Sequence, residues 1–177
     1  IAPSFRSSYQ LLRTQLPQAV ILTGERGVGL TSLARDLAGD RLEQVVQPTN
    51  TKGDIDTQRG TISIETIRNL YQSTRGKSST SRIVVIDSAD RMTTQAQNAF
   101  LKLLEEPPDA MKYILTAHQP SHLLPTVISR LQQYQVPRLS DSQSQKLLEQ
   151  YPNLTDAERK QLLFVANGRP GLLNLLA

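Results

Sequence analysis

Cysteine is absent from this chain of 177 residues. Its absence excludes a disulfide framework and a zinc ribbon, and it fits a cytoplasmic protein. There are two histidines, His118 and His122, and neither has a third ligand nearby in the sequence. We therefore expect no metal centre, zinc included.

Long apolar runs are also missing, although 38% of the residues are apolar. A membrane-spanning helix needs about 20 consecutive apolar residues, so the sequence predicts a soluble globular protein with no membrane contact. There is no internal repeat and no low-complexity tail. The length fits one domain, or one domain with a small appendage. The net charge of +4 permits contact with DNA phosphates without requiring it.

Strand and helix patterns alternate along the first part of the chain. Short apolar or β-branched runs predict strands at residues 19–23, 45–48, 83–87, 113–116 and 133–136. Between them, periodic patterns predict helices at residues 32–38 and 62–73, and a third that a capping box at Thr94 opens and Pro107 ends. A polar loop covers residues 75–81. This alternation predicts an α/β fold with a parallel sheet covered by helices on both faces.

The pattern becomes helical after Pro137. Ser140 or Asp141 caps a helix that runs to Gln150, and a second capping box opens at Thr155. Further helical residues follow Gly168. We therefore divide the chain into an α/β domain at residues 1–138 and a small helical lid at residues 139–177.

A phosphate-binding loop without its lysine follows the first strand. Residues 24–31 (GERGVGLT) match the pattern G-x-x-x-x-G-K-[ST] except at the lysine, where Leu30 stands. In a working loop the backbone cradles phosphates, the lysine reaches the β- and γ-phosphates, and the hydroxyl ligates Mg²⁺. The loop residues Gly24, Gly27, Gly29 and Thr31 thus outline a nucleotide site that lacks its main cation.

A second catalytic residue is missing at the end of the strand at residues 83–87. Asp87 follows four apolar residues, like the acid that holds Mg²⁺ beside a phosphate loop. ATPases of the AAA+ class follow this acid with a glutamate that orients the attacking water, whereas Ser88 stands here. Asp90 is expected to point elsewhere. Two losses at two motifs indicate a subunit that does not hydrolyse ATP.

Three segments resemble the bacterial clamp-loader subunits of the AAA+ class. They are residues 87–92 (DSADRM), 96–108 (AQNAFLKLLEEPP) and 124–130 (LPTVISR). With its damaged loop, the chain is more similar to the delta-prime type of DNA polymerase III subunit than to the catalytic gamma/tau type. The resemblance implies a three-layer AAA+ P-loop sandwich followed by a helical lid. It also implies a further collar domain that has no counterpart in these 177 residues.

The resemblance implies a function as well. A delta-prime-like subunit helps load the sliding clamp onto primed DNA, together with gamma/tau and delta subunits, without being an enzyme itself. Arg130, preceded by Ser129, corresponds to an arginine that projects toward ATP on a neighbouring subunit, where it stabilises charge on the γ-phosphate. No cofactor of its own is expected, and residual ATP binding stays open.

The sequence departs from the family at several positions. Leu131 replaces a cysteine after Arg130, and Gly171 stands where a second nucleotide-sensing arginine is usual, with Arg169 two residues away. Thr116 falls near a sensor position that is only a strand-end residue if no ATP is hydrolysed. Two alternatives follow: a gamma/tau-like subunit that binds or hydrolyses ATP despite these losses, and a stand-alone protein-interaction module.

Overall fold

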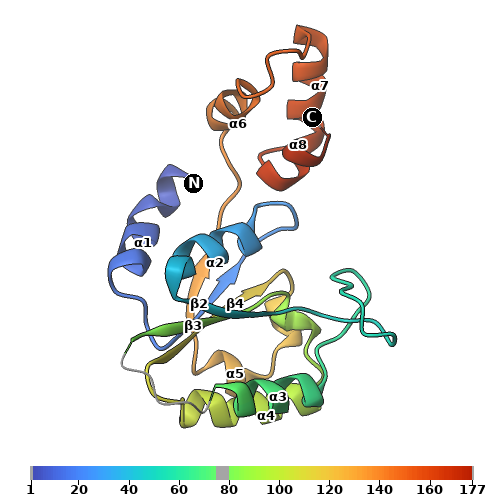
Figure 1. Cartoon of the computed structure of the whole chain (residues 1–177). Helices are drawn as coiled ribbons and strands as arrows, with labels where there is room; N and C mark the ends of the chain where they lie inside the picture. Colours follow the sequence, from blue (N-terminus) through green and yellow to red (C-terminus); the bar gives the residue numbers. More distant parts are fainter. Residues whose placement is uncertain (1, 75–79, 177) are drawn as a thin grey trace.

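The computed structural model describes residues 2–74 and 80–176. Figure 1 shows three layers: a sheet in the middle, α1 and α2 on one face, and α3, α4 and α5 on the other. The last helices, α6, α7 and α8, stand beyond the sheet on the side of α1 and α2. The predicted α/β three-layer architecture is confirmed.

The described residues form one sheet of five parallel strands in the order β2-β3-β4-β1-β5. The strands are β1 (Ala19–Thr23), β2 (Leu42–Val46), β3 (Arg82–Ile86), β4 (Met111–Ala117) and β5 (Gln132–Gln135). Because all of them run in one direction, their carboxyl ends share one edge, where open parallel sheets bind ligands.

The helices of the sandwich are α1 (Pro3–Thr14), α2 (Leu30–Ala38), α3 (Ile64–Ser73), α4 (Thr94–Glu105) and the short α5 (Pro125–Ile128). Short 3₁₀ turns lie at η1 (Gly39–Arg41), η2 (Ala89–Arg91) and η3 (Pro120–His122). The last three helices are α6 (Asp141–Leu148), α7 (Asp156–Ala166) and α8 (Pro170–Leu176). No helix among the described residues is long and apolar enough to cross a bilayer.

The central strands are buried on both faces, which explains their continuous apolar runs. Residues 83–86 are fully buried, and alternate side chains face opposite layers. Val84 and Ile86 pack with the α3 and α4 side, where Phe100 is also buried. Ile83 and Val85 pack with the α1 and α2 side. Each layer is therefore held by its own apolar core.

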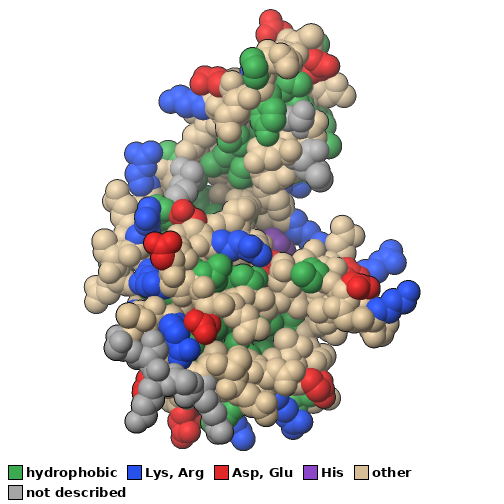
Figure 2. Space-filling model, in the orientation of Figure 1, with side chains coloured by type: hydrophobic (Ala, Val, Ile, Leu, Met, Phe, Trp, Pro, Cys, Tyr) green, Lys and Arg blue, Asp and Glu red, His purple; other side chains and the backbone are tan. Residues whose placement is uncertain are grey.

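The last three helices have a smaller core of their own, made by Leu148, Ala166 and Leu173. The capping boxes at Ser140 and Thr155 are both present, which fixes where α6 and α7 begin. Apolar side chains also reach the surface of this lid, as Figure 2 shows, and Phe164 is 86% exposed.

Several predicted boundaries are wrong by a few residues. β2 ends at Val46 instead of continuing to residue 48, α2 begins at Leu30, and α6 ends at Leu148 instead of Gln150. The cap of α4 is Thr93 and not Thr94: the Thr93 hydroxyl accepts the Ala96 N–H at 3.1 Å. A capping residue must itself lie outside the helix, and Thr94 is already helical.

Two helices were not predicted at all. α1 buries only Phe5 and Leu12, so its apolar stripe is too sparse to stand out. α5 has only four residues and begins at Pro125. Residues 75–79 of the predicted polar loop lie outside the described residues.

Candidate functional site

Asp87 is the centre of a polar cluster at the carboxyl edge of the sheet. The Thr31 hydroxyl, at the start of α2, donates to Asp87 Oδ1 at 2.7 Å, and the Thr116 hydroxyl, near the end of β4, donates to the same oxygen at 2.8 Å. The Gln47 amide, directly after β2, donates to Asp87 Oδ2 at 3.1 Å. With 4% exposure, this carboxylate is buried and holds three donors of its own chain.

Thr116 has a wider role than that of a strand-end residue. Its hydroxyl oxygen also accepts the backbone N–H of Ser88 at 2.8 Å. This bond holds Ser88 in a left-handed conformation, with φ of 55°. Because Asp87 and Ser88 both bind Thr116, the turn after β3 is fixed to β4.

Asp90 lies apart from this cluster, as the sequence predicted. Its Oδ2 accepts the backbone N–H of Gln119 at 3.0 Å, beyond the end of β4. It therefore anchors the loop before η3 and does not take the place of the absent glutamate.

Leu30 is a core residue. It is only 2% exposed and belongs to the apolar cluster under α2, together with the loop residue Val28. Its Cδ2 atom lies 3.4 Å from the point where a Cβ on Gly24 would stand. The side chain at the lysine position is thus directed into the protein, against the loop's own backbone.

The lid contacts the loop directly. The backbone N–H of Gly171 donates to the carbonyl oxygen of Gly27 at 2.8 Å. Arg138 Nε, in the connection before α6, donates to Glu25 Oε1 at 2.9 Å. This hydrogen bond, with a smaller effect of the Arg169 charge, lowers the pKa of the Glu25 carboxyl. The loop is therefore joined to the lid through both its backbone and its acid.

A cavity of about 350 Å³ remains between the start of α2 and the lid. Its lining is mostly apolar and includes Val28, Leu33, Val136, Leu139 and Pro170. Arg169 does not turn into this space: its guanidinium donates to the carbonyl oxygens of Ala166 at 2.9 Å and Val165 at 3.0 Å. Gly171 stands where a nucleotide-sensing arginine is usual in the family, and here its backbone N–H binds Gly27 instead.

Arg130 lies two residues after α5, and its guanidinium is bound within its own chain. Nη2 donates to Glu105 Oε1 at 2.7 Å, and Nη1 donates to the Thr126 carbonyl at 2.9 Å. The Ser129 hydroxyl donates to the same carbonyl at 3.1 Å. The arginine side chain is 40% exposed and Glu105 is 51% exposed, so the ion pair faces solvent.

Sequence reasoning missed two members of the site. Gln47 was assigned to a strand, and its place directly after β2, at the same edge as Asp87, was the signal that could have identified it. His118 has no neighbouring ligand in the sequence that would mark it as part of a site, yet its Nδ1 lies 2.9 Å from the carbonyl oxygen of Gly24. The described residues contain no group of three or more His, Cys, Asp or Glu that could hold a metal ion.

The sheet order, the loop after β1 and the Asp87 cluster define a P-loop protein of the AAA+ class. More specifically, the chain belongs to the family described as "DNA polymerase III, delta subunit", whose sequence model matches residues 45–140. It is thus a clamp-loader-like protein of the DNA polymerase III and replication factor C group.

Curated relatives cover most of this chain. The replication factor C small subunit of Methanococcus maripaludis is 27% identical in an alignment of 154 residues that covers 84% of this chain and 46% of the relative. DNA polymerase III subunit tau of Escherichia coli is 30% identical in an alignment of 161 residues that covers 78% of this chain and 24% of the relative. The chain therefore spans less than half the length of these relatives.

Solved structures share the fold. A gamma subunit-related protein of DNA polymerase III from Thermotoga maritima has a TM-score of 0.69 and 21% identity, covering 97% of this chain and 56% of that one. The RuvB Holliday junction branch migration motor of the same organism has a TM-score of 0.72 and 13% identity, covering 98% and 59%. At these identities the likeness concerns the fold alone.

Proposed function

We propose that this chain is a non-catalytic clamp-loader subunit of the delta-prime type. It acts beside gamma/tau and delta subunits in loading the sliding clamp onto primed DNA, and it supplies Arg130 to ATP on a neighbour. The family match and the tau and replication factor C relatives support the clamp-loader part of this proposal. The state of the loop at residues 24–31 supports the non-catalytic part.

The observation that carries the proposal is the buried Leu30. Phosphate binding at this loop needs a cation aimed at the β- and γ-phosphates, and the residue at that position instead packs in an apolar core. Asp87 and Thr31, the two Mg²⁺-binding groups of the pattern, are bonded to each other. The site keeps these two groups but has no cation for the β- and γ-phosphates, and Ser88 supplies no base for water, which supports a subunit that does not hydrolyse ATP.

A gamma/tau-like ATPase is the alternative that an assay can exclude. Purified chain is expected to show no ATP turnover above that of a mock preparation, whether or not labelled ATP binds to it in equilibrium dialysis. Turnover that the Asp87→Ala variant abolishes would contradict the proposal. An intact fold of that variant, checked by circular dichroism, makes the comparison valid.

A different experiment tests whether the protein is a stand-alone interaction module. A version of this protein that carries a clamp-loader collar domain, mixed with purified gamma/tau and delta subunits, is expected to co-elute with them in size-exclusion chromatography, whereas residues 1–177 alone should not form a stable assembly. Elution of the collar-containing version by itself at every concentration tested, with the partner subunits competent for assembly, would favour the module.

A further inference from the structure

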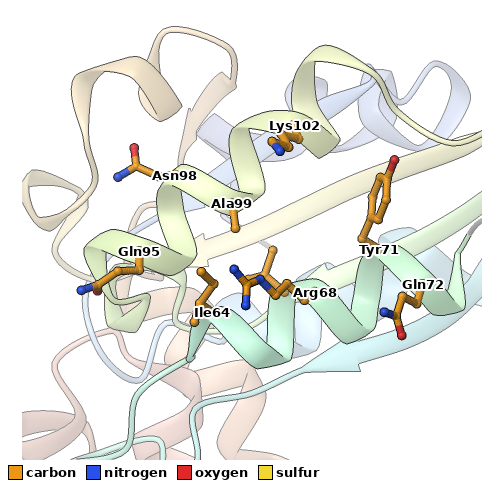
Figure 3. Close-up of a pocket in the computed structure, with 9 residues that line it drawn as sticks. Ile64, Arg68, Tyr71, Gln72, Gln95, Asn98, Ala99 and Lys102 are labelled. Carbon is orange, nitrogen blue, oxygen red and sulfur yellow. The ribbon is translucent and has the colours of Figure 1, made fainter.

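A groove between α3 and α4 lies on the outer side of the sandwich, away from the Asp87 cluster. Its volume is about 680 Å³. Figure 1 places these helices in the layer farthest from the lid, and Figure 3 shows Ile64 and Arg68 of α3 and Ala99 of α4 turned toward the space between them. The groove is thus separate from the Asp87 cluster and from the loop at residues 24–31.

The floor of the groove is apolar and its rim is positive. Ile64, Ile67 and Ala99 form the floor. Arg68 on α3 and Lys102 on α4 are exposed at the rim, and among the described residues neither is within 4.0 Å of a carboxylate. Glu105, one turn after Lys102, is already paired with Arg130. No described Asp or Glu lines the groove.

Amide side chains complete the rim. Gln72 comes from α3, and Gln95 and Asn98 come from α4. Amides donate and accept hydrogen bonds, so they can satisfy the polar groups of an incoming peptide without adding charge. The helices have 10 and 12 residues, so the groove is about 15–18 Å long, the length of a short partner helix.

We propose that the α3–α4 groove docks an acidic amphipathic helix of a partner protein. Apolar side chains of that helix cover Ile64, Ile67 and Ala99, and its carboxylates pair with Arg68 and Lys102. This is the helix-in-groove mode of recognition, in which an apolar stripe gives affinity and flanking charges give register and specificity.

A nucleic acid strand fits these features less well. Proteins that bind single strands use rows of cations for phosphates and aromatic faces on which bases stack. Among the residues that the structure describes, two cations flank an apolar floor, and Tyr71, the one aromatic side chain in the lining, is half-buried. The charge pattern complements spaced carboxylates on a helix more closely than a continuous phosphate backbone.

Fluorescence anisotropy with designed peptides tests this proposal. The probe is a labelled helical peptide of about 14 residues with leucines at i, i+4 and i+7 and glutamates beside them. We expect it to bind the chain, and we expect binding to weaken about tenfold or more in the double variant Arg68→Glu, Lys102→Glu. The same peptide with lysine for each glutamate should prefer the double variant.

The control is the double variant Lys146→Glu, Lys160→Glu, which changes the net charge equally on exposed positions of α6 and α7. It should bind the acidic peptide like the unaltered chain. Absence of peptide binding, or equal losses in both double variants, would overturn the proposal. Binding of oligo(dT) in place of the peptide, with the same dependence on Arg68 and Lys102, would assign the groove to nucleic acid instead. All variants change exposed side chains, and thermal unfolding verifies their fold.

Discussion

At the scale of single residues, Leu30 is the side chain that most distinguishes this phosphate loop from one that binds ATP, in our proposal. A lysine there would have to leave the apolar cluster that the leucine now fills, because an ammonium group is not stable among apolar neighbours. Leu30 therefore gives the loop a packing contact and no cation for a phosphate. In our proposal Ser88 acts in the same direction, since it supplies no base for hydrolysis.

The variant Leu30→Lys should lose stability without becoming an ATPase. Removing a buried leucine is expected to lower the free energy of unfolding by about 2 kcal/mol, measured by urea denaturation. Leu30→Met, of similar volume, should cost less than about 1.5 kcal/mol. ATP turnover should remain at background with lysine alone, because Ser88 still provides no base. The double variant Leu30→Lys, Ser88→Glu is the fairer test of restored activity, and full activity of the single variant would show that our account of Ser88 is wrong.

Arg130 is a second single residue with a proposed role, which it would perform on a neighbouring subunit. Its exposed pair with Glu105 is the kind of surface ion pair that contributes about 0–1 kcal/mol, so a γ-phosphate can displace it. The contact with Glu105 is thus compatible with a resting position of a trans-acting arginine.

Arg130→Ala should lower the DNA- and clamp-stimulated ATPase of an assembled clamp loader while leaving the unfolding of this chain unchanged. The loss at the site that faces this subunit can reach about a thousandfold, and the total loss is smaller because other sites continue to turn over. Arg130→Lys should also be impaired, since an ammonium cannot reproduce the planar fork. Glu105→Gln is the control: it removes the negative charge of the resting partner and should retain activity. Unchanged ATPase in Arg130→Ala would remove the proposed role.

Gln97 shows how, at the element scale, one buried side chain can join several segments. It is 3% exposed, and its amide nitrogen donates at 3.1 Å to the carbonyls of Met92 and His122. Its amide oxygen accepts the Leu124 N–H at 2.6 Å. The start of α4 is thereby attached to η3 and to the residue that precedes α5, the helix that leads to Arg130.

Replacing Gln97 by leucine should therefore destabilise the chain, although leucine is apolar and the position is buried. Two carbonyls and one N–H would lose their partner, at a combined cost of about 2–4 kcal/mol in the free energy of unfolding. Gln95→Leu, on an exposed position of the same helix, should change stability by less than about 0.5 kcal/mol. Urea denaturation of both variants provides the measurement, and equal midpoints would contradict this role of Gln97.

At the scale of the whole molecule, contacts between the phosphate loop and the lid hold the lid against the α/β sandwich. Gly27 and Gly29 have nearly the same φ, +88° and +89°, but different surroundings. A Cβ on Gly27 would stand 3.3 Å from the Cβ of Arg169 in the lid, whereas a Cβ on Gly29 would meet nothing within 4 Å. Alanine substitutions at these two glycines therefore distinguish the effect of backbone strain from the effect of a clash with the lid.

Gly29→Ala is expected to cost only left-handed strain, about 1–2 kcal/mol. Gly27→Ala should add to this a displaced lid, seen as faster amide hydrogen exchange in α8 and at Gly171, whose N–H binds the Gly27 carbonyl. Equal exchange of α8 in both variants would show that the lid does not depend on this contact.

The sequence by itself determined the features that depend on neighbouring residues. The strand runs, the helices that follow them, the incomplete loop at residues 24–31 and the acid after β3 were all predicted, because each is a local pattern of period, cap or motif. The capping box of α7 was predicted for the same reason, and Ser140, one of two predicted caps, is the cap of α6. Among the described helices, turns and strands, the sparse α1, the short α5, the three 3₁₀ turns and some boundaries were missed or misplaced.

The tertiary structure alone decided which distant residues meet. Gln47 and Thr116 join Asp87 because β2, β3 and β4 are neighbours in parallel register, an arrangement that no local pattern encodes. The same holds for the Arg130 pair with Glu105 and for Gly171 against Gly27. The physical reason is that such contacts follow from how whole layers pack to bury their apolar faces, and packing is a property of the complete chain.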